Sequence, residues 1–232
     1  MNCPYLSYFC GMQASLFKDY GDYLAYAIDN LRFPEQPKDL YEAVTYIFSL
    51  GGKRLRPALC LFSAEAFGSD KSAALPAALC VETFHNFSLI HDDIMDAAQL
   101  RRKAPTVHEK WNTNTGILSG DLALIIAYRF LENYRDERFF KLYNRFNQTA
   151  IEVCEGQQMD MLFEQRKKVS VDEYLQMISY KTAVLLGCSL AMGAIVAGAE
   201  DSQVQHCYDI GLTIGEAFQL RDDYLDTFGN QE

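Results

Sequence analysis

Residues 78–98 read ALCVETFHNFSLIHDDIMDAA, with apolar residues recurring at spacings of three and four. Because this spacing places apolar side chains along one side of a helix, the stretch predicts a helix that is largely buried. Its last turns carry three carboxylates, Asp92, Asp93 and Asp96, with no lysine between them. Residues four apart share a helix face, so Asp92 and Asp96 would point in one direction. The stretch therefore predicts a buried helix with an acidic stripe near its end.

The same periodicity dominates the rest of the chain, and the alternation typical of strands is scarce. Clear examples are YEAVTYIFSL (41–50), RPALCLFSAEAFG (56–68), GDLALIIAYRFLENY (120–134) and HCYDIGLTIGEAFQLRDDYLD (206–226). Breaks are expected at Pro34 to Lys38, Gly51-Gly52, Gly68 to Ser72, Lys103 to Pro105 and Glu164 to Lys168. None of these breaks is long enough to link two domains. We therefore predict an all-α fold over residues 1–232, a single domain with roughly eight to ten bundled helices.

The bulk composition limits the classes of function. Of 232 residues, 49% are hydrophobic and 22% are charged, which is the balance of a folded globular protein. The formal net charge of −10 argues against a nucleic-acid-binding surface, although local basic clusters remain compatible with an anionic substrate. Seven scattered cysteines without a CxxC pair predict reduced thiols, packed as small apolar side chains in a cytoplasmic protein. The first twenty residues lack the pattern of a signal peptide.

The eighteen residues 182–199, TAVLLGCSLAMGAIVAGA, contain no charge. A membrane-spanning helix needs about 20 apolar residues, so this run lies at the lower edge of a spanning length. It is rich in Gly, Ala, Ser and Thr, and no other segment resembles it. We therefore expect a helix buried on all sides within the bundle rather than a transmembrane segment.

A second acidic cluster lies in LRDDYLD, residues 220–226, where Asp222 and Asp226 are again four apart. One such cluster is compatible with a solvated helix end, but two at the ends of apolar helices are a stronger signal. If the two helices face each other, carboxylates about 4 Å apart repel by roughly 4 kcal/mol at an effective dielectric of 20. A cavity lined by them needs cations, and oxygen ligands shared with phosphate favour Mg²⁺.

The segment GGKRLRP, residues 51–57, is the first candidate anion site. Its two glycines can end one helix, and Pro57 suits the first turn of the next. Lys53 and Arg56 would then lie at a helix N-terminus, where backbone N–H groups and the helix dipole attract phosphate. A solvated basic turn is the alternative interpretation of this segment taken alone.

Two further basic groups lie near the acidic helices. Arg101 and Arg102, followed by Lys103, come after the first acidic helix. Their planar guanidinium groups suit bidentate contact with phosphate, and ion pairing with the nearby aspartates is the alternative. Lys181, with Thr182 beside it, lies where a polar helix meets the uncharged one.

The histidines are weaker candidates. His85 lies one to two turns before Asp92, where a lone histidine is more often a packed residue than a ligand. His91 points away from the face that Asp92 and Asp96 share, so we expect a structural role for it. His108 and His206 show no partner in the sequence.

Taken together, these segments resemble the trans-isoprenyl diphosphate synthases, also called polyprenyl synthetases. The matching stretches are GGKRLRP, the helix FHNFSLIHDDIMD with its LRR sequel, SGD at 119–121, EGQQMD at 155–160, YKTA at 180–183 and FQLRDDYLD at 218–226. They occur in the family's order and cover most of the chain from about residue 40 onward. The resemblance implies an all-α bundle around a central cavity, usually a homodimer, which joins isopentenyl diphosphate to an allylic diphosphate and releases diphosphate.

The resemblance also implies a role for each matching residue. Mg²⁺, about three ions in the family and shared with the substrate diphosphate, would be bound by Asp92, Asp96 and Asp222, with Asp93 and Asp226 completing the motifs. Isopentenyl diphosphate would be held by Lys53, Arg56, His85 and Arg102. The allylic diphosphate would be held by Arg101 and Lys181, and Thr182 and Gln219 would lie near the breaking bond with their oxygens facing the carbocation.

The helix before the first motif can also limit product length, because one turn rises about 5.4 Å, comparable to one isoprene unit. Ser88 lies one turn below Asp92 on the same face, followed by Phe84, and Phe87 flanks the path. A small residue followed by aromatic ones predicts a short product, geranylgeranyl or farnesyl diphosphate. The motif lacks the two-residue insertion of the common bacterial farnesyl type, which favours geranylgeranyl.

The match departs from the family at the end of the chain, and other functions remain open. The family continues for several more helices after the second motif, so its C-terminal helices are expected to be missing here. A truncated homologue could act as a non-catalytic partner subunit of a synthase. A class I terpene cyclase or a head-to-head condensing enzyme would share the first motif. A phosphohydrolase using His85, His91 and Asp92 would leave the second cluster unexplained.

Overall fold

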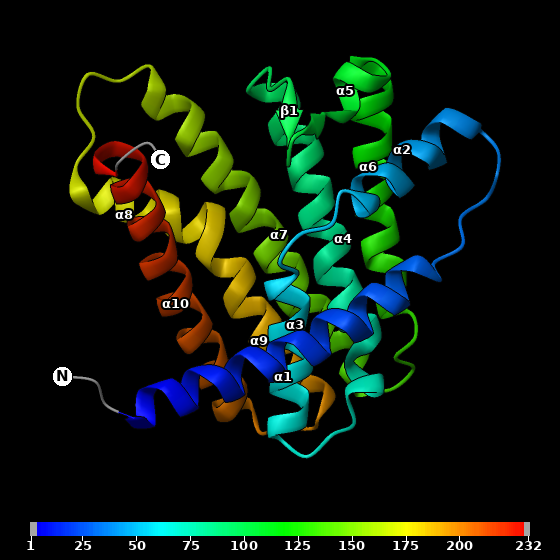
Figure 1. The fold of residues 1–232 in the computed structure, drawn as a ribbon, viewed down its shortest axis with the longest axis vertical. Helices are drawn as coiled ribbons and strands as arrows, with labels where there is room; N and C mark the ends of the chain where they lie inside the picture. The colour runs from blue at the N-terminus through cyan, green and yellow to red at the C-terminus, as the bar shows by residue number, and fades with distance from the viewer. Residues whose placement is uncertain (1–3, 230–232) are drawn as a thin grey trace. The chain divides into compact units, whose positions relative to one another are not determined.

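The computed structural model describes the backbone of residues 4–229 and the side chains of residues 17–229. It confirms the prediction of an all-α protein (Figure 1). Cys3, the side chain of Cys10 and the chain end at residues 230–232 lie outside the described part. The helices are α1 (Pro4–Asp29), α2 (Lys38–Ser49), α3 (Leu55–Ala66), α4 (Lys71–Met95), α5 (Val107–Lys110), α6 (Thr113–Leu131), α7 (Glu137–Glu164), α8 (Val171–Ile178), α9 (Val184–Val196) and α10 (Asp201–Phe228).

Two short features interrupt this helical pattern, and neither was predicted. Strands β1 (Leu100–Arg101) and β2 (Ala104–Pro105) form a small antiparallel hairpin after α4. A π-helical turn, η1 (Ser179–Ala183), joins α8 to α9 without a break in the helix. Both features fall at segments that carry candidate site residues.

The chain divides into two compact units. Unit 1 contains the residues up to Ala58 together with Leu79–Phe130, and unit 2 contains Leu59–Ala78 together with the chain from Leu131 onward. The prediction of a single domain over 1–232 stays a prediction.

Unit 1 is centred on the second half of α4, whose predicted burial is confirmed. Phe84 and Ile90 are fully buried there. Helix α6 packs closely against α4 at two glycines. A Cβ at Gly120 would lie only 2.2 Å from Nε2 of His91, so the helices can approach this closely only without a side chain there. A Cβ at Gly116 would likewise lie 2.9 Å from Cδ1 of Ile94. These close approaches bring the end of α4, with its aspartates, against α6.

Unit 2 is built around α9, which α7 and α10 flank (Figure 1). All of α9, Val184–Val196, is buried, as predicted for the uncharged run. Helices Lys71–Met95 and Val171–Val196 are long and apolar enough to cross a membrane, but 67% and 78% of their most apolar windows are buried within the protein. They therefore have the burial of core helices.

Glycines let the helices of unit 2 approach closely. A Cβ at Gly193 would lie 2.2 Å from the carbonyl oxygen of Cys60, and the Ser63 hydroxyl donates to the carbonyl of Leu190 at 2.7 Å. A Cβ at Gly211 would lie 2.6 Å from Cα of Gly187 on the neighbouring helix. Small residues at these crossings therefore fix the spacing of α9 from α3 and α10.

Pro76 lies inside α4, where it removes a backbone N–H and opens the helical turn. The hydroxyl of Tyr134 fills the gap, accepting from the N–H of Ala77 at 3.2 Å and donating to the carbonyl of Ala73 at 2.8 Å. The opened turn therefore keeps its hydrogen bonds, and the helix continues to Met95.

The predicted state of the cysteines is confirmed only in part. The five with described side chains, Cys60, Cys80, Cys154, Cys188 and Cys207, are free thiols. Three of them are buried and pack as small apolar groups, whereas Cys154 is exposed and Cys207 is half-buried. The prediction that all of them are packed was therefore wrong for Cys154, which lies on the outer face of α7.

Candidate active site

Helix α4 ends in the first acidic cluster, and its end is arranged by backbone hydrogen bonds. The N–H of Ala98 reaches the carbonyl of Asp93 at 2.9 Å, and the N–H of Ala97 reaches that of Ile94 at 3.3 Å. This is the Schellman pattern of helix termination, with Ala97 at a φ of +50° where glycine is usual. A non-glycine residue there costs about 1–2 kcal/mol, so the tertiary contacts of the following chain must hold it in place.

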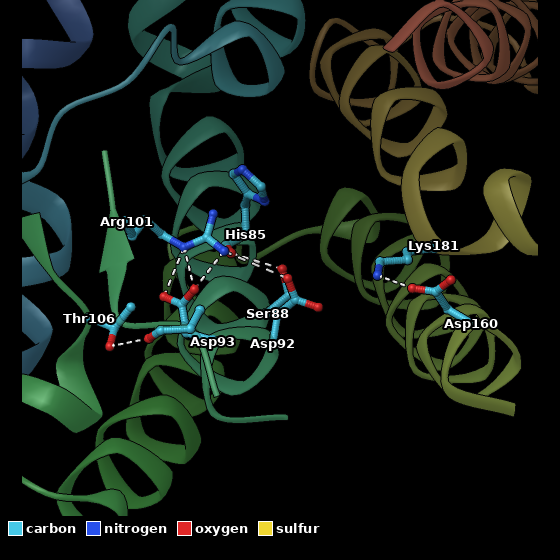
Figure 2. A network of polar contacts seen from close by, with 9 residues as sticks. His85, Ser88, Asp92, Asp93, Arg101, Thr106, Asp160 and Lys181 are labelled. Carbon is cyan, nitrogen blue, oxygen red and sulfur yellow. Dashed lines mark hydrogen bonds and ion pairs between the residues drawn. The ribbon is translucent and has the colours of Figure 1, made fainter. Parts of the chain in front are cut away.

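The chain after α4 folds back as the β1–β2 hairpin. Its two turn residues, Arg102 and Lys103, both have positive φ, of 53° and 67°, which is the geometry of a tight two-residue hairpin turn. The Thr106 hydroxyl donates to the carbonyl of Ala98 at 2.8 Å (Figure 2), and the Tyr46 hydroxyl donates to that of Pro105 at 2.7 Å. These hydrogen bonds offset the unfavourable positive φ of a turn that lacks the usual Asn or Gly.

The hairpin brings Arg101 back to the acidic cluster (Figure 2). Its Nε lies 2.8 Å from both carboxylate oxygens of Asp93, and its Nη2 lies 2.7 Å from Oδ1 of Asp93. The same Nη2 lies 3.7 Å from Oδ2 of Asp92. Burial lowers the pKa of Arg101, but the hydrogen bonds to Asp93 and the negative charges of Asp93, Asp92 and Asp96 together outweigh that effect, so the pKa is raised. Arg101 is therefore fixed in its charged form beside the cluster.

The three aspartates consequently differ in accessibility. The Asp93 side chain is 1% exposed and is engaged by Arg101, whereas that of Asp92 is 22% exposed. Asp96 is exposed. Within α4 the last turn holds no basic residue, and a helix C-terminus already carries a partial negative charge. Asp92 and Asp96 therefore offer carboxylate oxygens where the local field favours a cation.

The basic segment 51–57 adopts the predicted conformation. Gly51 and Gly52 have φ of 71° and 140°, and α3 begins at Leu55 with Pro57 in its first turn. Gly52 also contacts the hairpin, because a Cβ there would lie 2.7 Å from Nη2 of Arg102. The hairpin thus links the two charged regions of unit 1, with Arg101 on Asp93 and Arg102 on the basic segment.

Arg56 and His85 meet beneath this segment, with Nη1 of Arg56 lying 3.3 Å from Nε2 of His85. Burial, followed by the charges of Arg56 and Arg102, lowers the pKa of His85 well below its ordinary value. The imidazole is therefore neutral at pH 7 and can accept a hydrogen bond from Arg56. The side chain of Lys53, in the same basic segment, is exposed.

Sequence reasoning missed Glu82, which is only 4% exposed. Burial raises the pKa of its carboxyl, while the charges of Arg56, Arg54 and Arg102 lower it. A buried acid among arginines limits their mutual repulsion while no anion is bound. The available signal was a single Glu in an apolar run, three residues before His85 and therefore on its helix face.

In unit 2, the π-turn η1 directs the side chains of Lys181 and Thr182 to partners on different neighbouring helices. Nζ of Lys181 lies 2.5 Å from Oδ2 of Asp160 on α7 (Figure 2). Thr182 donates through Oγ1 to Oε1 of Gln219 on α10 at 2.9 Å. A π-turn inserts one residue into a helix and occurs often at functional sites. Asp160 was not predicted as a site residue, although it ends the EGQQMD motif.

The second acidic cluster lies near the end of α10. Asp222 is half-buried and Asp226 is exposed. Asp223 accepts from the Tyr174 hydroxyl at 2.5 Å and from Nε2 of Gln219 at 2.8 Å. The last turn of α10, up to Phe228, contains no basic residue. Asp222 and Asp226 therefore present carboxylates at a second negative helix end.

The donor set fits Mg²⁺ only when a phosphate shares the ion. Within residues 17–229, no three His, Cys, Asp or Glu side chains gather closely enough to hold a metal by themselves. Mg²⁺ is usually bound by one or two carboxylates together with water and substrate phosphate. Pairs of aspartates at two helix ends supply that number of protein ligands.

The residues predicted to limit product length lie together on α4. Phe84 is fully buried and Phe87 is 9% exposed, with ring centroids 5.4 Å apart. The Ser88 hydroxyl donates to the carbonyl of His85 at 2.9 Å, so it bends back onto its own helix. The three residues lie in the turns of α4 that precede Asp92, and their role in limiting product length stays a prediction.

The remaining histidines have no contact with the acidic cluster in the described residues. Nε2 of His91 lies 3.1 Å from the carbonyl of Ile117 and 3.7 Å from Oδ1 of Asp121, both on α6. These contacts agree with the structural role expected for His91. His108 lies 3.7 Å from Glu109, a neighbour along the chain, whereas the sequence showed no partner for it.

The structure thus brings the predicted residues together within each unit. In unit 1 it joins Arg101 to the first aspartates and Arg56 to His85, and in unit 2 it joins Thr182 to Gln219. Asp92 belongs to unit 1 and Asp222 to unit 2. That the two clusters face each other across one cavity stays a prediction.

Comparison with known proteins gives consistent relatives. The family model for polyprenyl synthetase matches residues 37–232. The geranylgeranyl diphosphate synthase of Methanosarcina mazei is 44% identical over 208 residues, which are 89% of this chain and 64% of that protein.

Two solved structures are similar over nearly the whole chain. A geranylgeranyl pyrophosphate synthase is 53% identical with a TM-score of 0.88, over 94% of this chain and 66% of that one. The geranylgeranyl pyrophosphate synthetase of Geoglobus acetivorans is 39% identical with a TM-score of 0.88, over 91% and 70%. The chain therefore spans close to two thirds of the length of these relatives.

Proposed function

Because this chain belongs to the polyprenyl synthetase family, we propose that it condenses isopentenyl diphosphate with an allylic diphosphate to give a short all-trans prenyl diphosphate. The observation that carries the proposal is the β1–β2 hairpin. Its Arg101 binds Asp93 of the acidic helix end, and its Arg102 lies against Gly52 of the basic segment. The hairpin thereby contacts both an acidic helix end and a basic segment, and this supports a site that takes two diphosphates.

The allylic diphosphate is assigned to the acidic helix ends. Asp92 and Asp96 would hold Mg²⁺ with it, Asp222 would hold a further ion, and Asp93 and Asp226 complete the two motifs. Bound Mg²⁺ neutralises the negative charge that grows on a departing diphosphate. Arg101 and Lys181 are assigned to the same diphosphate, and each is anchored within its own unit to a carboxylate, Asp93 or Asp160.

Isopentenyl diphosphate is assigned to the basic segment of unit 1. Lys53, Arg56 and Arg102 supply positive charge there, and the neutral His85 orients Arg56. Arginine forks bind phosphate oxygens in pairs, which fixes the position of the second substrate as well as neutralising it.

Thr182 and Gln219 are assigned to the reacting carbons. When the carbon–oxygen bond of the allylic diphosphate breaks, positive charge develops on carbon, and side-chain oxygens fixed beforehand stabilise it. The cation must meet the double bond of isopentenyl diphosphate before it meets water, so the site must exclude solvent. Formation of the new carbon–carbon bond leaves a cation that loses a proton from an adjacent carbon to form a double bond. Departing diphosphate can accept this proton, so no side-chain base is required.

Product analysis tests this proposal. The purified chain is incubated with Mg²⁺ and labelled isopentenyl diphosphate, with dimethylallyl, geranyl or farnesyl diphosphate in separate reactions. Labelled products longer than the primer are expected, and EDTA should abolish them. A folded chain that gives no extended product with any primer would contradict the proposal and favour a partner-subunit role.

The same experiment separates the remaining alternatives. A terpene cyclase would convert an allylic diphosphate to hydrocarbon without consuming isopentenyl diphosphate. A phosphohydrolase would release phosphate from either substrate alone. The contacts of His91 are with Ile117 and Asp121 of α6 rather than with Asp92, and they do not support the latter function.

Replacing the aromatic residues below Asp92 is expected to lengthen the product. Each helical turn corresponds to about one isoprene unit, so Phe87→Ala should add one unit and Phe84→Ala a further one. Removing a buried phenyl group costs about 3–5 kcal/mol, so Phe84→Leu serves as a milder variant. Phe140→Ala, at a 67% exposed position on α7, is the control. If chromatography shows an unchanged product length in all α4 variants, the prediction that these residues limit product length is contradicted.

Assembly and location belong to the same proposal. A homodimer working in the cytoplasm agrees with the family and with the free thiols of the described cysteines. Geranylgeranyl diphosphate is the proposed product, supported by the names of the similar proteins and by the bulky residues on α4.

A further inference from the structure

A continuous chain of polar side chains crosses unit 2. The Tyr174 hydroxyl on α8 lies 2.5 Å from Oδ2 of Asp223 on α10. The other carboxylate oxygen of Asp223 accepts from Nε2 of Gln219 at 2.8 Å. Oε1 of Gln219 then accepts from the Thr182 hydroxyl at 2.9 Å. Four side chains from α8, η1 and α10 are thus connected by three hydrogen bonds.

The chemistry of the groups sets one direction for all three bonds. A carboxylate can only accept, so both Tyr174 and Gln219 must donate to Asp223. Once the amide nitrogen of Gln219 is turned toward Asp223, its oxygen must point the other way, toward Thr182. Thr182 has one hydroxyl proton and donates it to that oxygen. Because the Thr182 hydroxyl gives its proton to Gln219, its oxygen can offer lone pairs to a positively charged partner.

We propose that Tyr174 and Asp223 are positioning residues, which orient Gln219 and Thr182 so that their oxygens face the developing carbocation. The inference rests on the proposed function for what the oriented oxygens do. It assigns Asp223 a different role from its neighbour Asp222, because both of its carboxylate oxygens already accept hydrogen bonds from the protein.

The first acidic cluster shows the same division. The second aspartate of that pair, Asp93, is engaged by Arg101 through both oxygens, whereas the first, Asp92, is more exposed. In each Asp-Asp pair, the second carboxylate therefore anchors the helix end to neighbouring side chains.

The environment of Tyr174 supports its role as a permanent donor. Burial, followed by the hydrogen bond to Asp223, raises the pKa of Tyr174 to about 12. The hydroxyl consequently keeps its proton at any pH at which an enzyme of this kind would work. Asp223 always has the same donor on Oδ2, and the direction of the chain of hydrogen bonds does not reverse.

Two variants break the chain of hydrogen bonds, and two matched controls leave it intact. Tyr174→Phe removes the hydroxyl, and Asp223→Asn replaces an acceptor with a group that also donates. Asp209→Asn is the control for the second, because Asp209 accepts from Gln205 on the same helix, also four residues apart, at 2.8 Å. Tyr224→Phe is the control for the first, because Tyr224 is 63% exposed.

The first readout does not depend on activity. The side-chain amide resonance of Gln219 is identified in a ¹H–¹⁵N spectrum by its absence from Gln219→Glu. It should shift in Tyr174→Phe and Asp223→Asn and stay in place in both controls. A resonance that does not move in either variant would overturn the hydrogen-bonded network, whether or not the chain makes product.

The second readout is steady-state turnover with titrated Mg²⁺. Misplacing a catalytic group by about 1 Å costs about a hundredfold, so kcat should fall by about ten- to a hundredfold in both variants. The Mg²⁺ concentration for half-maximal rate should stay constant, whereas Asp222→Asn should raise it. If kcat stays unchanged although the Gln219 resonance shifts, the positioning role is overturned. It is also overturned if Asp223→Asn raises the Mg²⁺ concentration for half-maximal rate as much as Asp222→Asn does. Absence of product from the unaltered chain would refute the proposed function, and the resonance would still decide the network.

Discussion

Asp92→Asn is expected to lower the turnover of isopentenyl diphosphate by about a thousandfold. The substitution keeps the shape of the side chain but removes one negative charge at the C-terminal end of α4, where that charge would hold Mg²⁺ and the leaving diphosphate. Loss of a single fixed electrostatic contact to a charge that develops during reaction costs about 10²- to 10³-fold. Asp93 cannot substitute for it, because Arg101 engages both of its oxygens.

The same variant should not weaken the fold. A carboxylate at a helix C-terminus is unfavourable, whereas the Asp92 contact with Arg101 at 3.7 Å is favourable, so removal of the Asp92 charge is expected to change the free energy of unfolding by less than about 1 kcal/mol. Turnover with titrated Mg²⁺ and urea unfolding of the same preparation measure the two effects. Asp22→Asn, at an exposed position on α1, is the matched control and should change neither. Turnover within a factor of three of the unaltered chain would contradict the role of Asp92.

Gly156→Ala is expected to destabilise the protein and to displace Lys181. A Cβ at Gly156 would lie 2.3 Å from the backbone nitrogen of Lys181 and 2.7 Å from the carbonyl carbon of Tyr180, both in η1. Because these are backbone atoms, α7 and the π-turn must move apart. Overpacking of this kind costs about 1–3 kcal/mol. The Lys181–Asp160 contact spans the same two helices, so turnover should fall by about a hundredfold.

Gly21→Ala is the matched control, with the opposite expected sign. Gly21 lies within α1, and a Cβ there would meet no atom within 4 Å. Alanine in a helix interior is about 1 kcal/mol more favourable than glycine, so this variant should be more stable than the parent chain. Urea unfolding of both variants gives the comparison. Stabilisation by Gly156→Ala would show that α7 and η1 are not in close contact.

The local conformation of several segments could be predicted because it depends on neighbouring residues alone. The glycine pair and Pro57 of GGKRLRP act through their own backbone geometry, and the observed φ values agree with the prediction. The burial of α9 likewise follows from eighteen residues without a charge, which no exposed helix would tolerate.

Other features depend on contacts between distant segments, and sequence reasoning missed them. The hairpin turn at Arg102 and Lys103 lacks the residues that favour positive φ, and bonds from Tyr46 and Thr106 stabilise it. The π-turn at Lys181 breaks the 3.6-residue period that identifies helices. Asp160 and Tyr174 have ordinary positions in their own helices, so only the packing of α7, α8 and α10 reveals their partners.

By itself the sequence determined that the protein is helical, that two helices end in aspartates, and which residue types could bind diphosphate and Mg²⁺. Periodicity, helix termination and the charge of a side chain are set within a few residues, so they can be recognised without a fold. Only the tertiary structure decided which of the neighbouring aspartates is held by protein, Asp93 by Arg101 and Asp223 by Tyr174 and Gln219. Two adjacent carboxylates are chemically identical, and they differ only because folding brings a donor from elsewhere in the chain to one of them.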